Sequence, residues 1–325
     1  MKRAHGLDWL RLAALMAVMA LHISSSVWSG MPVGTGEWLI ATLIRQTWAV
    51  PVLVMITGSL LLDPERPPEI HRRLRRIMGA YLPWSAVYQL YYLACRGFSD
   101  WKGALAGVLT GAYHMWYLWM LAGLYLVTPL LRPIAKEKKL CRLFLGLHLG
   151  ASCLTYFGPH LPWVGTALKQ VAEMAHLDFL AGYTGLYLLG WYLKRWPPER
   201  KWGWIGPACY GTCICGNLMI TLKTGANSEY FTNYLSPTML IAAGGIFLLF
   251  TKIDRPCPAW ASRLSLQAYL AHALVNEAVV ALITKERLMA RPLWMLPATA
   301  LVAVGSFGMA WILEEGRKRL WKSTL

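Results

Sequence analysis

Residues 12–36 read LAALMAVMALHISSSVWSGMPVGTG, and they contain no Lys, Arg, Asp or Glu. About 20 predominantly apolar residues are enough to cross the hydrocarbon core of a bilayer as a helix. The stretch is too long for the apolar region of a secretory signal, and further apolar stretches follow it directly. This stretch therefore predicts a transmembrane helix.

The composition extends this interpretation to the whole chain. Hydrophobic residues make up 56% of the 325 residues and charged residues only 15%, a balance unusual for a soluble domain. We expect an all-α polytopic membrane bundle, with residues 1–325 forming one transmembrane domain and no separate soluble domain. The predicted spans are residues 8–28, 38–62, 77–95, 113–131, 143–157, 178–193, 204–221, 236–251, 264–283 and 292–314, about ten in all.

The positive charges give these spans a direction. If the N-terminus lies in the cytoplasm, about 23 of the Lys and Arg residues fall in cytoplasmic segments and about 7 in outer ones. Both termini are then predicted to be cytoplasmic. A net charge of +16 can indicate nucleic-acid binding in a soluble protein. Here the charge lies in short loops between spans, so we expect a lipid bilayer and no nucleic acid as the partner.

The seven cysteines do not predict a disulfide framework or a metal site. Their number is odd, and most lie in or beside apolar segments. Cys213 and Cys215 form a C-x-C pair, but no second pair completes a zinc site. We expect no bound metal.

Ionisable groups within membrane spans are costly, so each is a candidate functional residue. Arg11 and His22 are separated by eleven residues, about 1100° of helical rotation, so they share one helix face, with a rise of about 16 Å between them. Asp8 can pair with Arg11 from three residues before it. The alternative is a snorkelling arginine and a packing histidine. The other candidates are Arg45, His114, His272 and Glu277.

The segment from Gly6 to Leu15, followed by His22, resembles the opening motif of membrane acyltransferase family 3, in which an Arg is followed after ten residues by a His. Residues 49–58 resemble the second-helix motif of that family, with Thr57 where Ser is more usual. Further resemblances follow in the expected order at residues 72–76 with 81–84, 114–118 with 123–130, 235–237, and 269–272.

This resemblance implies transfer of an acyl group, usually acetyl from cytoplasmic acetyl-CoA, to a hydroxyl of a glycan or cell-envelope acceptor outside the bacterial cytoplasmic membrane. Coenzyme A is polyanionic, so the arginine cluster at Arg72, Arg73, Arg75 and Arg76 is the candidate donor site. If the stretch is helical, Arg72 with Arg75, or Arg73 with Arg76, can act as one clamp. The alternative is that these arginines serve only as a positive-inside signal.

Acyl transfer to an alcohol needs a base at the acceptor hydroxyl and stabilisation of the oxyanion. His22 suits the role of base, because an imidazole both accepts and returns a proton near neutral pH. Arg11, fixed by Asp8, is expected to steady the acyl donor. Arg45 is expected to serve the acceptor or the oxyanion, or else to snorkel outward.

The remaining candidates concern the acceptor. His114, Trp116 and Tyr117 lie at the predicted outer end of a span, where a sugar can stack on aromatic rings, although Trp and Tyr are also ordinary residues of the membrane interface. His272 is expected to support His22 or the donor channel, or else to be a packing histidine. Glu277 has no assigned role.

Two other classes of function remain open. A transporter or exporter would also need many spans and polar interior residues, but no two-half repeat is visible. A binding or sensory module is the third possibility, because the sequence also resembles the membrane domain of serine racemases linked to vancomycin resistance. The soluble racemase half is missing from this sequence, so we expect no racemase activity from it.

Overall fold

The computed structural model describes residues 5–96 and 101–323, and within them every regular element is helical. The predicted all-α class is therefore confirmed. The helices are α1 (His5–Trp28), α2 (Gly36–Arg45), α3 (Ala49–Leu61), α4 (Ile70–Arg96), α5 (Trp101–Thr110), α6 (Trp116–Lys136), α7 (Lys138–Tyr156), α8 (Gly165–Met174), α9 (Tyr183–Arg195), α10 (Ile205–Thr224), α11 (Pro237–Thr251), α12 (Ala259–Ile283), α13 (Lys285–Ala290) and α14 (Met295–Ser323).

Each predicted span overlaps helical structure, but not every one of these helices has the length and composition of a membrane span. Among the described residues, 7 helical segments are long and apolar enough to cross a bilayer. The helices α4, α9 and α11 are not among them: α9 and α11 have 13 and 15 residues, and α4 carries its arginines in its first turns. The count of ten stays a prediction.

The predicted span at residues 38–62 is interrupted. Helix α2 ends at Arg45 and α3 begins at Ala49, and Gln46 between them has an extended backbone. Pro51 favours a break here, because proline has no N–H to donate to Thr47 and is best tolerated in the first turn of a helix. The Thr47 hydroxyl instead accepts from the Ala49 N–H at 3.0 Å. The interruption leaves Gln46 and Thr47 outside regular helix.

Three of the connections between predicted spans contain short helices, α5, α8 and α13. Helix α4 also begins at Ile70, seven residues earlier than the predicted limit of 77, so the whole basic run 72–76 is helical. The arginines of this run therefore have a fixed helical arrangement.

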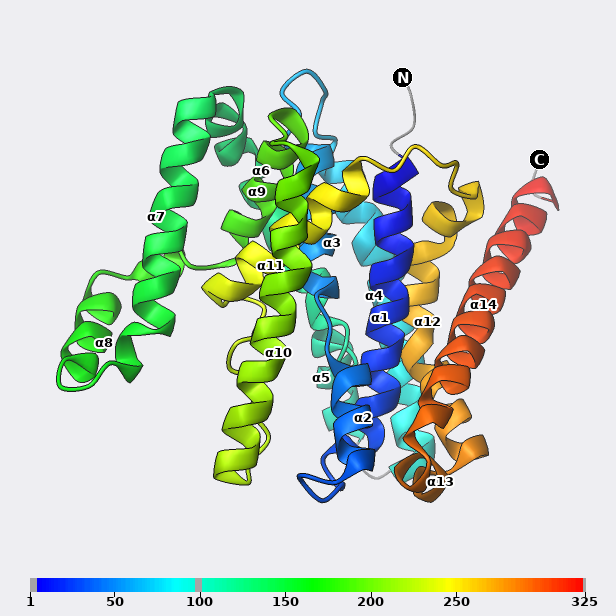
Figure 1. Ribbon diagram of the computed structural model, residues 1–325. Helices are drawn as coiled ribbons and strands as arrows, with labels where there is room; N and C mark the ends of the chain where they lie inside the picture. Colours follow the sequence, from blue (N-terminus) through cyan, green and yellow to red (C-terminus); the bar gives the residue numbers. More distant parts are fainter. Residues whose placement is uncertain (1–4, 97–100, 324–325) are drawn as a thin grey trace.

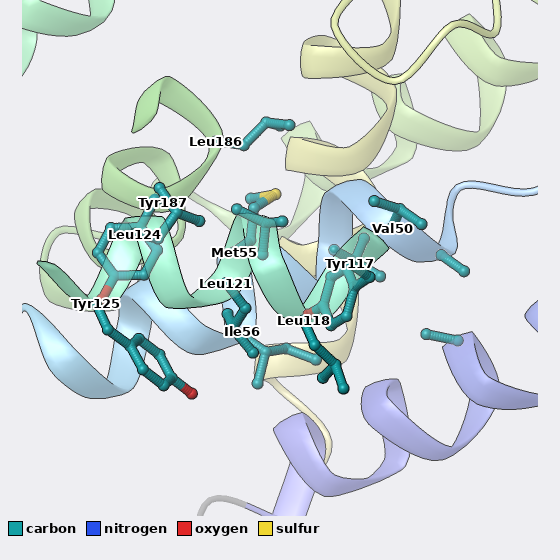
Figure 2. Packing of buried hydrophobic residues seen from close by; sticks show 14 of the residues in the cluster. Val50, Met55, Ile56, Tyr117, Leu118, Leu121, Leu124, Tyr125, Leu186 and Tyr187 are labelled. Atoms are coloured by element: carbon teal, nitrogen blue, oxygen red, sulfur yellow. The ribbon is translucent and has the colours of Figure 1, made fainter. Parts of the chain in front are cut away.

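Helix α1 lies near the middle of the bundle, between α3 and α11 on one side and α12 and α14 on the other (Figure 1). Helices α3 and α9 pack very closely, because Gly58 lies against the backbone of Tyr187 and Gly190 against that of Met55. Side chains of α6, among them Leu121 and Leu124, fill the core beside α3 and α9 (Figure 2).

Helix α1 begins and α14 ends at the same end of the bundle (Figure 1). An even number of crossings brings the two ends of a chain to the same side of a membrane. The arrangement is therefore compatible with the predicted topology, whose direction stays a prediction.

Candidate active site

A first cavity, of about 510 Å³, lies beside the N-terminal half of α1. Its apolar wall comes mainly from α3 and α6, including Leu53, Ile56 and Leu121. Its polar lining includes Asp8 and Arg11 of α1. The cavity therefore combines a long apolar wall with a cationic group.

Arg11 is held in place by two neighbours. Its Nη1 donates to the Asp8 carboxylate at 3.2 Å and to the Ser262 hydroxyl of α12 at 2.6 Å. The pairing with Asp8 is the one expected from their spacing. Because Asp8 is buried, the ion pair is shielded from solvent and fixes the direction of the guanidinium.

The basic run of α4 divides into two pairs. Arg73 and Arg76, three residues apart, both line the first cavity. Arg72 points away from it, with a side chain that is 82% exposed and paired with Glu69 at 3.2 Å. Arg75 is also exposed and is not part of the cavity lining. The structure thus brings one of the two expected clamps to the cavity.

A second cavity, of about 370 Å³, lies beside the C-terminal half of α1. His22 and Ser25 of α1 line it, together with Arg45 and Thr47 at the break between α2 and α3. Residues 229–234, in the connection between α10 and α11, supply much of its other wall. Most of the residues that line the second cavity have polar side chains, whereas most of those that line the first are apolar.

Arg45 lies in this second cavity and does not extend freely outward. It forms an ion pair with Glu229, and its guanidinium lies 4.3 Å from the centre of the Trp28 ring. Its Nε is buried and has no hydrogen-bond partner among the described residues. One donor of Arg45 is therefore available to a ligand in this cavity.

Aromatic rings border the second cavity. Tyr113 and Tyr234 line it, and Trp116 stacks on Tyr234 with the ring centres 6.3 Å apart. Burial raises the pKa of the Tyr234 phenol above its ordinary value, so this phenol stays protonated and can donate a hydrogen bond. Trp116 is 40% exposed, which leaves part of its surface accessible.

Two of the predicted sugar-stacking residues lie elsewhere. Tyr117 follows Trp116 by one residue, about 100° around the helix, and lines the first cavity. His114 is 1% exposed and lies in the interior. The structure therefore does not support the prediction that a sugar stacks on His114 or Tyr117, whereas Trp116 keeps an accessible ring.

Three histidines gather between the two cavities. The ring of His22 lies 5.1 Å from that of His272, which lies 4.8 Å from that of His114. His272 bonds through Nδ1 to the Tyr269 carbonyl of its own helix. Among the described residues, no three His, Cys, Asp or Glu side chains converge as a metal site. The arrangement is suited to proton transfer and hydrogen bonding.

Helix α1 thus presents Arg11 to one cavity and His22 to another, and both side chains face α12. Residues 4–315 match the acyltransferase domain of acyltransferase family 3. The chain belongs to this family. It is a membrane acyltransferase, as the resemblance of its motifs indicated. The chain matches no curated protein and no solved structure.

Several residues of the acyltransferase site were not predicted from its sequence. Thr57, Tyr125 and Ser262 line the first cavity, and Tyr113 lines the second. Thr57 lies in a recognisable motif, and Tyr113 directly precedes one, so both had a signal nearby. Tyr125 also lies in a motif, at residues 123–130, whereas Ser262 is an ordinary helix residue that only the packing of α12 brings to the cavity. Glu277, which had no predicted role, is exposed on α12.

Proposed function

We propose that the protein is an O-acetyltransferase of the bacterial cytoplasmic membrane. It would take acetyl from cytoplasmic acetyl-CoA and transfer it to a hydroxyl of a glycan or other cell-envelope acceptor on the outer side. The observation that carries the proposal is the position of α1, whose Arg11 lines one cavity and whose His22 lines the other. An acyl group that moves along α1 from Arg11 to His22 would pass from the cavity of the donor to the cavity of the acceptor.

The first cavity fits acetyl-CoA in its chemistry. Arg73 and Arg76 provide the charge-assisted hydrogen bonds that phosphate groups favour. The apolar wall from α3 and α6 suits the pantetheine arm, and Arg11 lies deeper along α1. In this proposal the nucleotide end binds at α4 and the thioester reaches toward His22.

The second cavity is the proposed acceptor site. Arg45 and Glu229 neutralise each other there, and the remaining lining is rich in hydroxyl and amide groups. These groups suit a hydroxyl-rich acceptor such as a sugar. The rings of Tyr113 and Trp116 offer apolar faces beside it.

The chemistry requires one proton carrier. His22 takes the proton from the acceptor hydroxyl as its oxygen attacks the thioester carbonyl carbon. The new carbon–oxygen bond forms, the carbon–sulfur bond breaks, and His22 returns the proton to the departing thiolate. No proton is gained or lost overall.

His272 is suited to hold His22 in position. The Tyr269 carbonyl can only accept, so His272 donates from Nδ1 and, when neutral, has a lone pair on Nε2. That Nε2 is buried and has no partner among the described residues. It can accept an N–H from His22, which would leave the other nitrogen of His22 free to act as the base.

The test uses detergent-purified full-length protein with labelled acetyl-CoA and a panel of neutral and acidic glycans. We expect the wild-type protein to acetylate at least one glycan and His22→Ala to lose this activity. Full transfer by His22→Ala would show that the proposed base is wrong. Movement of a glycan across vesicle membranes without chemical change would favour an exporter, and binding without either outcome would favour a sensory module.

A further inference from the structure

The buried polar atoms that lack partners are concentrated around His22. Among the described residues, these atoms include both ring nitrogens of His114, Nε2 of His272, Oδ1 of Asn276 and Nε of Arg45. A buried polar group without a partner destabilises a folded protein, because it gives up its hydrogen bonds to water without replacing them. Such groups are expected where a ligand completes the hydrogen bonding, so their concentration points to the reacting centre.

His114 is the most unusual member of this group. It is 1% exposed, and neither of its ring nitrogens forms a well-aligned hydrogen bond among the described residues; the Leu270 carbonyl lies near the ring but already accepts from the Tyr88 hydroxyl. An imidazole in either protonation state carries at least one N–H. His114 therefore holds a buried N–H whose nearby protein acceptor, the Leu270 carbonyl, is poorly aligned and shared with Tyr88.

The surroundings of His114 place this donor between the two cavities. Its ring lies 5.6 Å from that of Tyr269, which lines the first cavity, and 5.4 Å from that of Tyr113, which lines the second. Its backbone is also fixed, because the Tyr269 hydroxyl donates to the His114 carbonyl at 2.5 Å. The ring of His114 therefore lies between a residue that lines the first cavity and a residue that lines the second.

We propose that His114 is a catalytic residue that donates its N–H to the thioester carbonyl oxygen. The proposal rests on the proposed acetyl transfer. When the acceptor oxygen attacks, the π electrons of the carbonyl move onto its oxygen, and the N–H of His114 stabilises the resulting oxyanion. When the carbon–sulfur bond breaks, these electrons re-form the carbonyl. His114 neither gains nor loses a proton, whereas His22 carries the proton of the acceptor.

Arg45 is the other candidate for the oxyanion, but its position is less suitable. It forms an ion pair with Glu229 in the acceptor cavity, so its charge is already compensated. His114 contacts His272, which in turn contacts His22, and it is far less exposed than the Arg45 side chain. The structure therefore favours His114 for the carbonyl and Arg45 for the acceptor.

The first test compares His114→Gln with His114→Met, which have similar size but differ in having a side-chain N–H. We expect His114→Met to lower kcat by about 10²–10³-fold, as loss of one oxyanion donor does in other enzymes. The KM for acetyl-CoA should stay near the wild-type value, and His114→Gln should retain more of the kcat. His148→Met is the control, because His148 is equally buried but lies on α7 and bonds to the Leu180 carbonyl.

The second test needs no acceptor. In the His22→Ala protein, the carbonyl stretch of bound [1-¹³C]acetyl-CoA is expected to lie at lower frequency than in solution. It should return toward the solution value when His114→Met is added. If His114→Met does not fold, His114→Asn and His114→Leu differ in the same donor and give the same comparison.

The outcomes separate the two proposals. Wild-type kcat in His114→Met, or an unchanged carbonyl frequency, would overturn the role of His114 while leaving acetyl transfer through His22 intact. Failure of the wild-type protein to consume acetyl-CoA with any acceptor, or full activity of His22→Ala, would contradict the proposed function itself. Equal losses in His114→Gln and His114→Met would also contradict the donor role.

Discussion

The four arginines at the start of α4 differ in what they contact. Arg73 and Arg76 line the first cavity, whereas Arg72 and Arg75 are directed elsewhere on the same helix. Helical geometry alone could not distinguish the pairs, because both have the same three-residue spacing. The packing of α4 against α6 and the neighbouring helices decides which pair reaches the cavity, although Arg76 is itself partly exposed to solvent.

This difference leads to a test with internal controls. We expect Arg73→Ala and Arg76→Ala each to raise the KM for acetyl-CoA by about 10-fold or more, because each removes a charge-assisted hydrogen bond. Arg72→Ala and Arg75→Ala should change KM by less than about 3-fold, as expected for exposed charges. Steady-state kinetics over a range of acetyl-CoA concentrations measures all four. Equal effects would mean that the run acts only as a general positive charge.

The sequence was most informative where a motif combined with helical spacing. Eleven residues between Arg11 and His22 predict a shared helix face, and in the structure both face α12. Sequence could not separate Trp116 from Tyr117, because both are aromatic and adjacent. Which of the two faces the interior depends on where α6 packs, and this is a property of the whole bundle.

At the scale of elements, the contact between α3 and α9 depends on two glycines. A Cβ on Gly58 would lie 1.8 Å from the Tyr187 carbonyl oxygen, and one on Gly190 would lie 2.0 Å from that of Met55. No flexible side chain can move aside, because the opposing atoms are backbone. The two helices must therefore separate if either glycine gains a side chain.

We accordingly expect Gly58→Ala or Gly190→Ala to destabilise the protein by about 1–3 kcal/mol or more, as overpacking generally does. Gly123→Ala on α6 is the matched control, since its Cβ would meet no atom within 4 Å. Thermal unfolding in detergent, followed by the loss of monodisperse protein, provides the measurement. An unchanged melting temperature in both test variants would show that α3 and α9 are less closely packed.

The interruption between α2 and α3 shows why a hydropathy pattern cannot define elements fully. Residues 38–62 have the hydropathy of one continuous span, and the structure breaks them at Gln46–Trp48. Pro51 signals the break in the sequence, but prolines also occur inside membrane helices, as Pro129 does in α6. The two sites differ in how neighbouring groups accommodate the backbone carbonyl that each proline leaves without a helical hydrogen bond. Only the three-dimensional structure shows this difference.

At the scale of the whole molecule, the number of spans determines where the loops lie. Ten spans with a cytoplasmic N-terminus place the segment around Lys138 inside and the connection at 225–236 outside. We expect green fluorescent protein fused at the C-terminus to fluoresce, because it folds in the cytoplasm. We also expect alkaline phosphatase fused after Ser228 to be active and the same enzyme fused after Lys139 to be inactive.

The reverse pattern at Lys139 and Ser228 would show that a helix before them does not cross the membrane. For a reversal at both sites helix α4 is the first to question, and for a reversal at Ser228 alone helix α9 is, because neither has the length and composition of an ordinary span. If green fluorescent protein fused at the C-terminus did not fluoresce, the number of spans would be odd. The same-end placement of α1 and α14 makes this the less expected result.

The partition between the two cavities also has an electrical consequence. An energised membrane holds its voltage across the material that excludes water and ions. If the two cavities open to opposite sides of the membrane, as the proposed function requires, they concentrate the voltage across the residues between Arg11 and His22. One elementary charge moved through the full potential changes free energy by about 2.3 kcal/mol per 100 mV. A charge that moves between Arg11 and His22 during catalysis would therefore cross a large part of the membrane potential. The turnover of the enzyme in vesicles should then respond to an imposed potassium diffusion potential, which a soluble acyltransferase cannot sense.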